Sequence, residues 1–230
     1  DSCCIFFLSP ATGRHVKHYV SNKKESPRMC ESNLMEFFTR VHWTVPLIIF
    51  LPVITTLAGI GMLKHHNTIG DTAMYAVFGL AFWTFTEYSL HRFVFHYHPK
   101  SAWGGKIHWM FHGVHHDYPS DPLRLVMVPS VSLPLASLFF LLFWWAMGLA
   151  AALPFTAGFL AGYLFYDITH YAVHHFPVKG RVFGTLRELH MRHHFQDPER
   201  GFGVSSPLWD LVFGTTLHRS ATDRAETGKG

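Results

Sequence analysis

Charged residues are scarce in this chain of 230 residues: they make up 15% of it, against about 25% in typical soluble domains. The formal net charge is +4, and the basic residues are scattered among apolar segments, which argues against nucleic acid as a partner. Cysteine is also rare. Cys3, Cys4 and Cys30 all lie near the N-terminus, which excludes a disulfide framework and a thiolate metal site.

Long apolar segments, in contrast, are abundant, and hydrophobic residues make up 49% of the chain. Segments 43–63, 72–90, 131–152 and 154–171 each offer roughly the 20 residues that a helix needs to cross the hydrocarbon core. Pro154 and the small residues Gly148 to Ala152 divide the last two, which are expected to be joined by a very tight turn. We therefore predict an all-α integral membrane protein with four transmembrane helices.

The basic residues predict how these helices are oriented. Of the 19 Lys and Arg residues, 18 lie before the first segment, between the second and third, or after the fourth. Positive charge favours the cytoplasmic side, so we expect these regions there, with 91–125 and 172–218 forming a helical cap. The predicted membrane-embedded domain is 34–218, between an irregular N-terminal tail (1–33) and a C-terminal tail (219–230). Residues 34–40 are expected to form an interfacial helix.

Histidine is the unusual residue of this sequence: there are 19, more than the 15 Asp and Glu combined. Ten of them form one H-x4-H pair, one H-x3-H pair and two H-x-x-H-H triplets at the predicted cytoplasmic ends of the spans. Spacings of three and four place imidazoles on one face of a helix. Neutral imidazole binds iron, zinc, copper and nickel, and ten ligands suit two ions. The predicted metal ligands are His91, His96, His112, His115, His116, His170, His174, His190, His193 and His194.

Two acidic residues and three further histidines lie beside these clusters. Glu87 and Asp167 are inside apolar segments, where acids are costly and are usually functional. They are expected either to accept a hydrogen bond from a ligating imidazole or to join helices. His98, His108 and His175 stay open as ligands or as partners that orient a ligand.

The order of the four histidine clusters resembles the fatty acid hydroxylase superfamily, which also contains sterol desaturases, sterol methyl oxidases and carotenoid hydroxylases. Flanking residues are more specific. The segments HRFVFH (91–96), HGVHH (112–116), RLVMVP (124–129), YDITHY (166–171) and GFGVSSPLWDLVFG (201–214) are similar to the fatty acid 2-hydroxylase branch. The resemblance covers about residues 34–218.

This resemblance implies a membrane-bound, dimetal, O2-dependent monooxygenase that hydroxylates C2 of a long acyl chain, in a free fatty acid, an acyl-CoA or a ceramide. It also implies that the ten histidines ligate both metals. Iron is expected because oxygen activation needs redox change, which zinc cannot supply. The same imidazoles bind zinc tightly, so a purified sample can hold it.

The resemblance further implies partners and a location. Residues 1–40 are too short for a cytochrome b5 domain and lack its His-Pro-Gly-Gly motif. Electrons are therefore expected from a separate donor, such as cytochrome b5 with its reductase, unless this sequence is only the membrane domain of a longer protein. The acyl substrate is expected from the bilayer. The expected location is the endoplasmic reticulum membrane in a eukaryote, or the inner membrane in a bacterium, with the site on the cytoplasmic side.

Two other interpretations stay open. The same centre can act on a sterol, as a desaturase or as a methyl oxidase. A histidine-rich metal transporter would belong to a different class of protein. Transporters usually place ligands near the bilayer midplane, whereas these clusters lie at the ends of the predicted spans, which argues against transport.

Overall fold

The computed structural model describes residues 20, 21 and 23–217, and this part of the chain is helical without strands. The predicted tail 219–230 and most of the predicted tail 1–33 lie outside the described residues. In chain order the elements are α1 (Asn33–Phe37), α2 (Thr44–His65), α3 (Ile69–Leu90), the π-helix η1 (His91–Phe95), α4 (Ala102–His108), the π-helix η2 (Trp109–Gly113), α5 (Val114–Asp117), α6 (Pro129–Met147), α7 (Leu149–His175), α8 (Arg181–Phe195) and α9 (Leu208–Phe213).

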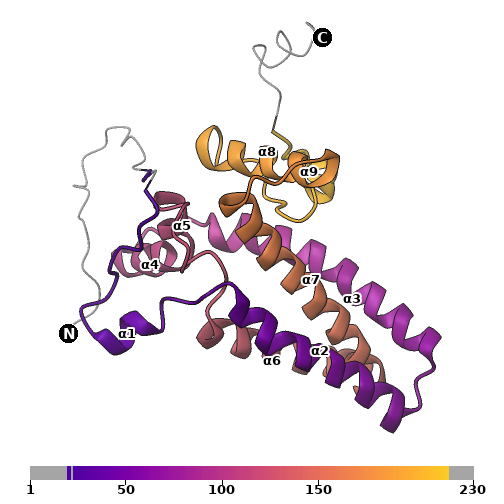
Figure 1. Ribbon diagram of the computed structural model, residues 1–230. Coiled ribbons are helices and arrows are strands. Elements are labelled where there is room, and N and C mark those ends of the chain that lie inside the picture. The colour runs from indigo at the N-terminus through magenta and orange to yellow at the C-terminus, as the bar shows by residue number, and fades with distance from the viewer. Residues whose placement is uncertain (1–19, 22, 218–230) are drawn as a thin grey trace, which may run out of the picture.

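Four long helices form a bundle with α7 at its centre, packed against α2, α3 and α6 (Figure 1). Most of α7 is buried, whereas few residues of α2 and α6 are buried inside the protein. The short helices η1, α4, η2 and α5, together with α8 and α9, gather at one end of the bundle. The predicted all-α class is confirmed, and the cap is built from the two regions expected for it.

Three of these helices are long and apolar enough to cross a membrane: α2, α6 and α7. These apolar helices indicate a membrane protein. Helix α3, expected as a fourth span, has the length, with 22 residues, but does not reach the same hydropathy. Its sequence carries Asp71 and Glu87 together with several Thr, Tyr and Gly residues, which lower its mean hydropathy.

The turn between α6 and α7 lies earlier than the sequence suggested. Gly148 makes it alone, with φ +77°, and α7 then runs on through Pro154. A proline inside a helix cannot donate to the carbonyl four residues before it, here that of Ala150. The amide Nδ2 of Asn67 donates to this carbonyl oxygen at 2.7 Å. The expected boundary between 152 and 154 was wrong because a side chain from the α2–α3 loop replaces the donor that Pro154 lacks. The break lies at Gly148, the first of the small residues expected to divide this stretch.

Helices α3 and α7 cross at very short range through glycines. A Cβ atom on Gly79 would lie 1.9 Å from the carbonyl oxygen of Phe155, and one on Gly158 would lie 1.9 Å from that of Ala76. Gly158 and Gly162 form a G-x-x-x-G pair, a spacing that allows close helix approach in membranes. This contact places the end of α7, with its histidines, beside the end of α3.

Candidate metal centre

The structure brings all ten predicted ligands together at the bundle end that faces the cap. They form two groups of five, and within each group the potential ligand atoms lie within 4.8 Å of one another. The rings of His116 and His194, one from each group, have centroids 4.3 Å apart, so the two groups adjoin. The first group is His91, His96, His112, His116 and His193, and the second is His115, His170, His174, His190 and His194.

Each H-x-x-H-H triplet contributes to both groups. In α8, His190 and His194 are four residues apart and join the second group, whereas His193 joins the first. The triplet of η2 and α5 has the opposite assignment, with His115 in the second group. The first and last histidines of a triplet are four residues apart and share a helix face. The middle histidine of the triplet points about one quarter of the circumference away from that face. The triplet spacing therefore lets one helix serve two neighbouring sites.

The H-x4-H pair is brought together by a π turn. His91 and His96 are five residues apart, a spacing that an α-helix does not place on one face. The backbone N–H of His96 donates to the carbonyl of His91 at 3.1 Å, which is the i→i+5 bond of a π-helix. As a result their Nε2 atoms lie 3.2 Å apart. Sequence reasoning grouped this pair with the three- and four-residue spacings and missed the π turn.

The nitrogen atoms in both groups fit metal ligation. The Nδ1–H groups of His91 and His193 donate to the carbonyls of Phe202 and Arg200, at 2.5 and 2.7 Å. Carbonyls only accept, so Nε2 of both rings keeps its lone pair. Nε2 of His193 is buried and has no hydrogen-bond partner. In the second group, Nε2 of His190 lies 2.8 Å from that of His174 and 3.1 Å from that of His194. Converging lone-pair nitrogens of this kind suit a metal cation.

Burial keeps the cap imidazoles in the form that binds a metal. It holds the pKa of His112, His115 and His194 well below the usual value of 6.5, and neighbouring histidines lower these pKa values further. The pKa of His193 is also lowered by burial, although the Arg200 carbonyl opposes this effect. At neutral pH these rings are uncharged, with one nitrogen lone pair each, which is the state required of a ligand.

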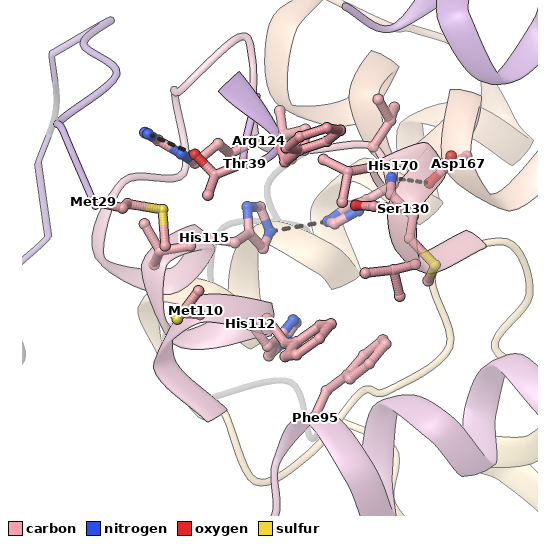
Figure 2. A pocket seen from close by; sticks show the side chains of 18 of the residues that line it. Met29, Thr39, Phe95, Met110, His112, His115, Arg124, Ser130, Asp167 and His170 are labelled. Atoms are coloured by element: carbon pink, nitrogen blue, oxygen red, sulfur yellow. Dashed lines mark hydrogen bonds between the residues drawn. The ribbon is translucent and has the colours of Figure 1, made fainter. Parts of the chain in front are cut away.

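A cavity of about 260 Å³ reaches both histidine groups (Figure 2). His112 of the first group and His115 and His170 of the second lie in its wall. Most of the remaining lining is apolar and comes from η2, α5, the segment 125–128, α6 and the region around α1, with Arg124, Thr39, Ser130 and Asp167 as polar members. An apolar ligand in this cavity would therefore lie directly against the histidines.

The sequence pattern of the fatty acid hydroxylase family matches residues 76–215, which include all ten histidines. The chain belongs to the fatty acid hydroxylase family. It is 42% identical to the dihydroceramide fatty acyl 2-hydroxylase FAH2 of Arabidopsis thaliana, over 83% of this chain and 80% of the relative. It is 37% identical to the ceramide very long chain fatty acid hydroxylase SCS7 of Saccharomyces cerevisiae, over 80% of this chain and 48% of the relative. A solved structure of full-length scs7p, in which only the hydroxylase domain is visible, has a TM-score of 0.77 and 35% identity, and the match covers 83% of this chain and 72% of that one.

These similarities confirm the family inferred from the histidine motifs, and this hydroxylase is an oxidoreductase. The division of the histidines into two groups was left open by the sequence, and their role as ligands stays a prediction. His98, His108 and His175 lie outside both groups. His108 contacts the Phe95 carbonyl through Nε2, and His175 stacks on Tyr171 with ring centroids 4.4 Å apart.

Glu87 of the hydroxylase contacts a loop beside the histidines and not an imidazole. Its carboxylate accepts hydrogen bonds from the backbone N–H groups of Val204 and Ser205, both at 2.8 Å, and from the Ser205 hydroxyl. Asp210 accepts from the N–H groups of Phe202 and Gly203, at 3.0 and 2.8 Å. The two acids thus hold the loop whose carbonyls orient His91 and His193. Both expectations for Glu87 were wrong: its partners Val204 and Ser205 are neither an imidazole nor part of another helix. Glu87 instead joins α3 to the segment between α8 and α9.

Asp167 also lacks the expected imidazole donor. It accepts hydrogen bonds from the Tyr163 hydroxyl at 2.9 Å and from the Met127 N–H at 3.3 Å, so it joins α7 to the segment before α6.

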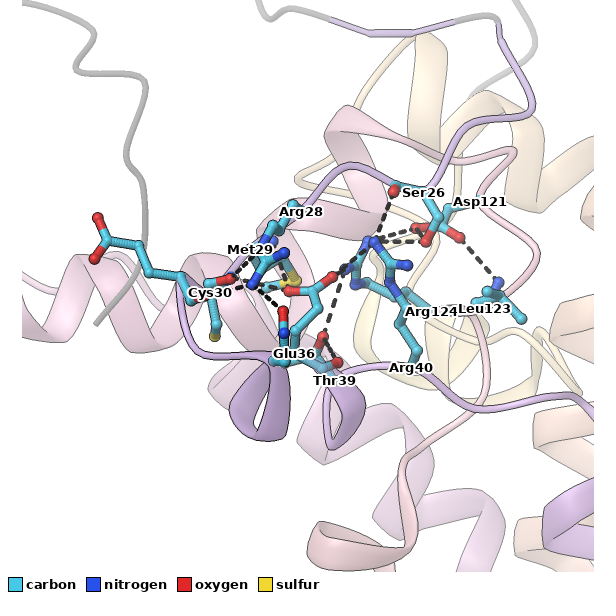
Figure 3. Close-up of polar contacts among 12 residues, drawn as sticks. Ser26, Arg28, Met29, Cys30, Glu36, Thr39, Arg40, Asp121, Leu123 and Arg124 are labelled. Carbon is cyan, nitrogen blue, oxygen red and sulfur yellow. Dashed lines mark hydrogen bonds and ion pairs between the residues drawn. The ribbon is translucent and has the colours of Figure 1, made fainter. Parts of the chain in front are cut away.

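Sequence reasoning also missed a polar network at the cavity wall (Figure 3). There the Arg124 guanidinium pairs with Glu36 at 2.7 Å and with Asp121 at 3.0 Å. The sequence indicated this network only weakly: Arg124, Glu36 and Asp121 are charged residues close to apolar segments, where charged residues are rare.

Proposed function

We propose that this hydroxylase inserts one oxygen atom of O2 at C2 of the long N-acyl chain of a ceramide or dihydroceramide. The observation that carries the proposal is the cavity, because its largely apolar wall ends on histidines of both metal groups. In the overall reaction a C–H bond becomes C–OH. The second oxygen atom leaves as water, with two electrons and two protons supplied from outside.

The residues around the cavity position the acyl chain and exclude water. Two metal ions held by the ten histidines, for which we propose iron, would supply the oxygen-activating redox chemistry. Apolar side chains such as Phe95, Met110 and Val126 line the path toward the histidines. Buried walls of this kind keep a reactive centre dry and hold the chain in one register. Met127 also lines a second, smaller cavity between α3, α6 and α7, which extends toward the bundle.

The charges at the cavity wall favour a neutral acyl amide over a free carboxylate. Among the described residues, Arg124 is the one Lys or Arg that lines the cavity, and Glu36 and Asp121 already neutralise it. Asp167 adds a further acid to the wall. A carboxylate would be buried there without a free cation, which is costly, whereas an amide carbonyl carries no net charge.

For membrane arrangement we propose four spans, with α3 as the fourth, and both histidine groups on the cytoplasmic side. Support comes from the distribution of 18 of the 19 basic residues. The proposed location is the endoplasmic reticulum membrane in a eukaryote, or the inner membrane in a bacterium. A separate protein, such as cytochrome b5 with its reductase, would deliver the electrons. The similar proteins are acyl 2-hydroxylases, so they do not support the sterol or transport interpretations.

Mass spectrometry of lipids tests this function. The chain would be expressed in cells that contain cytochrome b5 and its reductase but no endogenous 2-hydroxylase, beside a His193→Ala variant and a vector control. The expected result is a rise in 2-hydroxy N-acyl sphingolipids with the wild-type chain only. Hydroxylation in the free fatty acid pool alone would contradict the proposed acyl carrier. A change in sterols, without 2-hydroxy acyl lipids, would overturn the proposed reaction.

A further inference from the structure

Helix α1 presents an apolar face that no part of the described chain covers. Leu34, Phe37 and Phe38 lie three and four residues apart, on one face of the helix, and are 67%, 72% and 51% exposed. Together they form a large apolar patch for so short a segment. Such patches in soluble proteins mark binding surfaces, because leaving them in water is unfavourable.

The opposite side of α1 is fixed to the cavity wall. Glu36 is buried and its carboxylate pairs with Arg124 and Arg40, both at 2.7 Å. It also accepts hydrogen bonds from the N–H groups of Met29 and Cys30, at 2.9 Å each (Figure 3). With Glu36 held in this way, the helix cannot turn its apolar face toward the protein without breaking a buried ion pair.

The same helix borders the mouth of the cavity. Met35 of α1, Phe38 directly after it and Phe111 of η2 line the cavity and remain 45%, 51% and 54% exposed, so they form its rim. Ser130 and Val131, in the first turn of α6, line it as well. The rim therefore lies beside the start of a candidate span, and α1 is followed within seven residues by the start of another, at Thr44. Figure 1 places α1 at this end of the bundle.

From these observations we infer that α1 lies in the lipid surface and that the mouth between α1 and η2 opens into the bilayer. The occupant of the apolar face is membrane lipid, because only residues 38–43 separate α1 from α2, a candidate span that the bilayer surrounds. The acyl substrate then enters sideways from the membrane, past Phe38 and Phe111, and does not pass through water. This inference rests on the proposed lipid substrate and names the route that the substrate takes.

Spin labels measure the position of α1 without relying on turnover. A nitroxide would be attached at Leu34→Cys, Phe37→Cys and Phe111→Cys, one at a time, in protein reconstituted into phosphatidylcholine nanodiscs. Cys3 and Cys4 would be replaced by Ser throughout, and Cys30, 1% exposed, would be kept. The measured quantity is the ratio of collisions with O2, which concentrates in the bilayer, to collisions with a water-soluble nickel chelate. Leu51→Cys on α2 and Glu199→Cys in the cap, both at exposed positions, serve as lipid and water references.

The expected result is a ratio at positions 34, 37 and 111 well above that at Glu199 and below that at Leu51, which lies deeper in the bilayer. A ratio at Phe37 equal to that at Glu199 would overturn the placement of α1 in lipid. A water-like ratio at Phe111 alone would overturn the lateral opening. Each labelled variant should elute as the unlabelled protein does on gel filtration, which separates misfolding from exposure. Lipid-like ratios together with no 2-hydroxy product in cells would contradict the proposed function and leave this inference standing.

Discussion

At the scale of single residues, the convergence of the ten histidines could be predicted, but their division between two groups could not. The motifs place imidazoles on helix faces, and these residues do converge. Which group each joins depends on how α8 lies against α5 and α7, which local spacing does not encode. His115 meets His170 from α7, with Nε2 atoms 2.9 Å apart, although 55 positions separate them in the sequence.

The division predicts what single substitutions do to metal content. His116→Ala should reduce bound metal from two ions per chain to about one by weakening the first site, and His174→Ala should do the same at the second. Turnover should be lost in both variants, because neither site alone can complete the centre. Metal analysis of purified protein measures the stoichiometry.

The matched control is His98→Ala, because His98 is exposed and lies outside both groups. It should retain two ions and activity. Retention of two ions by His116→Ala, in protein of unchanged elution volume, would show that this residue is not a ligand.

Glu36 predicts a pH-dependent contribution to stability. Burial raises its pKa, but the N–H groups of Cys30 and Met29 and the charges of Arg124 and Arg40 together lower it below the usual 4.5. A carboxyl with a lowered pKa in the folded state contributes stability above its unfolded pKa and loses it as the pH falls through the folded value. Glu36→Gln should therefore cost about 2 kcal/mol at pH 7.

Thermal unfolding in detergent at a series of pH values would measure this effect. The unfolding midpoint of the variant should lie below that of the wild type at pH 7, and the difference should shrink below pH 4.5, where the wild-type carboxyl also loses its charge. A difference that stays constant across this range would mean that the Glu36 charge does not carry the effect.

At the scale of elements, the apolar runs predicted the long helices well, because a stretch of about 20 apolar residues has few alternatives to a buried or membrane helix. What they missed depends on contacts between elements. The α6–α7 turn lies at Gly148 because Asn67 compensates for Pro154. The π turns η1 and η2 could not be predicted from an α-helical period of 3.6 residues, because a π turn holds more residues. Each one contains a histidine of the first group and changes the direction of its side chain.

The crossing of α3 and α7 predicts a strong effect of a single methyl group. Gly158→Ala would place a Cβ atom 1.9 Å from the carbonyl oxygen of Ala76, so the helices must move apart. The free energy of unfolding should fall by about 3 kcal/mol or more, because substitutions that overpack a core typically cost about 1–3 kcal/mol and this clash is with backbone. A lower unfolding midpoint and a loss of bound metal should appear together, because this crossing positions the histidine end of α7.

Gly184→Ala is the control for this substitution. Gly184 lies inside α8, and the nearest atom to an added Cβ would be 3.7 Å away. Replacing a helical glycine by alanine without a clash should stabilise the fold by about 0.5–1 kcal/mol. If Gly158→Ala behaved in the same way, the close approach of α3 and α7 would be contradicted.

At the scale of the whole molecule, each histidine group takes its members from elements far apart in the chain. The second group joins α5, α7 and α8, and the first joins η1, η2, α5, α8 and the residue after η1. Within the described residues, α8 otherwise meets the bundle mainly through its contact with α7. The bound ions would therefore link the cap to the bundle, so metal binding and the folding of the cap should be coupled.

Metal removal tests this coupling. Each ion present at about 100 times its dissociation constant adds about 2.7 kcal/mol to the stability of the folded state. Chelation should therefore lower the thermal unfolding midpoint. It should also make α8 susceptible to protease, while the bundle stays protected by lipid or detergent. The His116→Ala variant, which keeps only the second site, should lose less stability on chelation than the wild type. Coupling between metal binding and cap folding would be contradicted if chelator-treated protein, shown by metal analysis to be free of ions, unfolded at the wild-type temperature with α8 still protected. The ligands would then be held together by packing alone, and the metals would serve only the reaction.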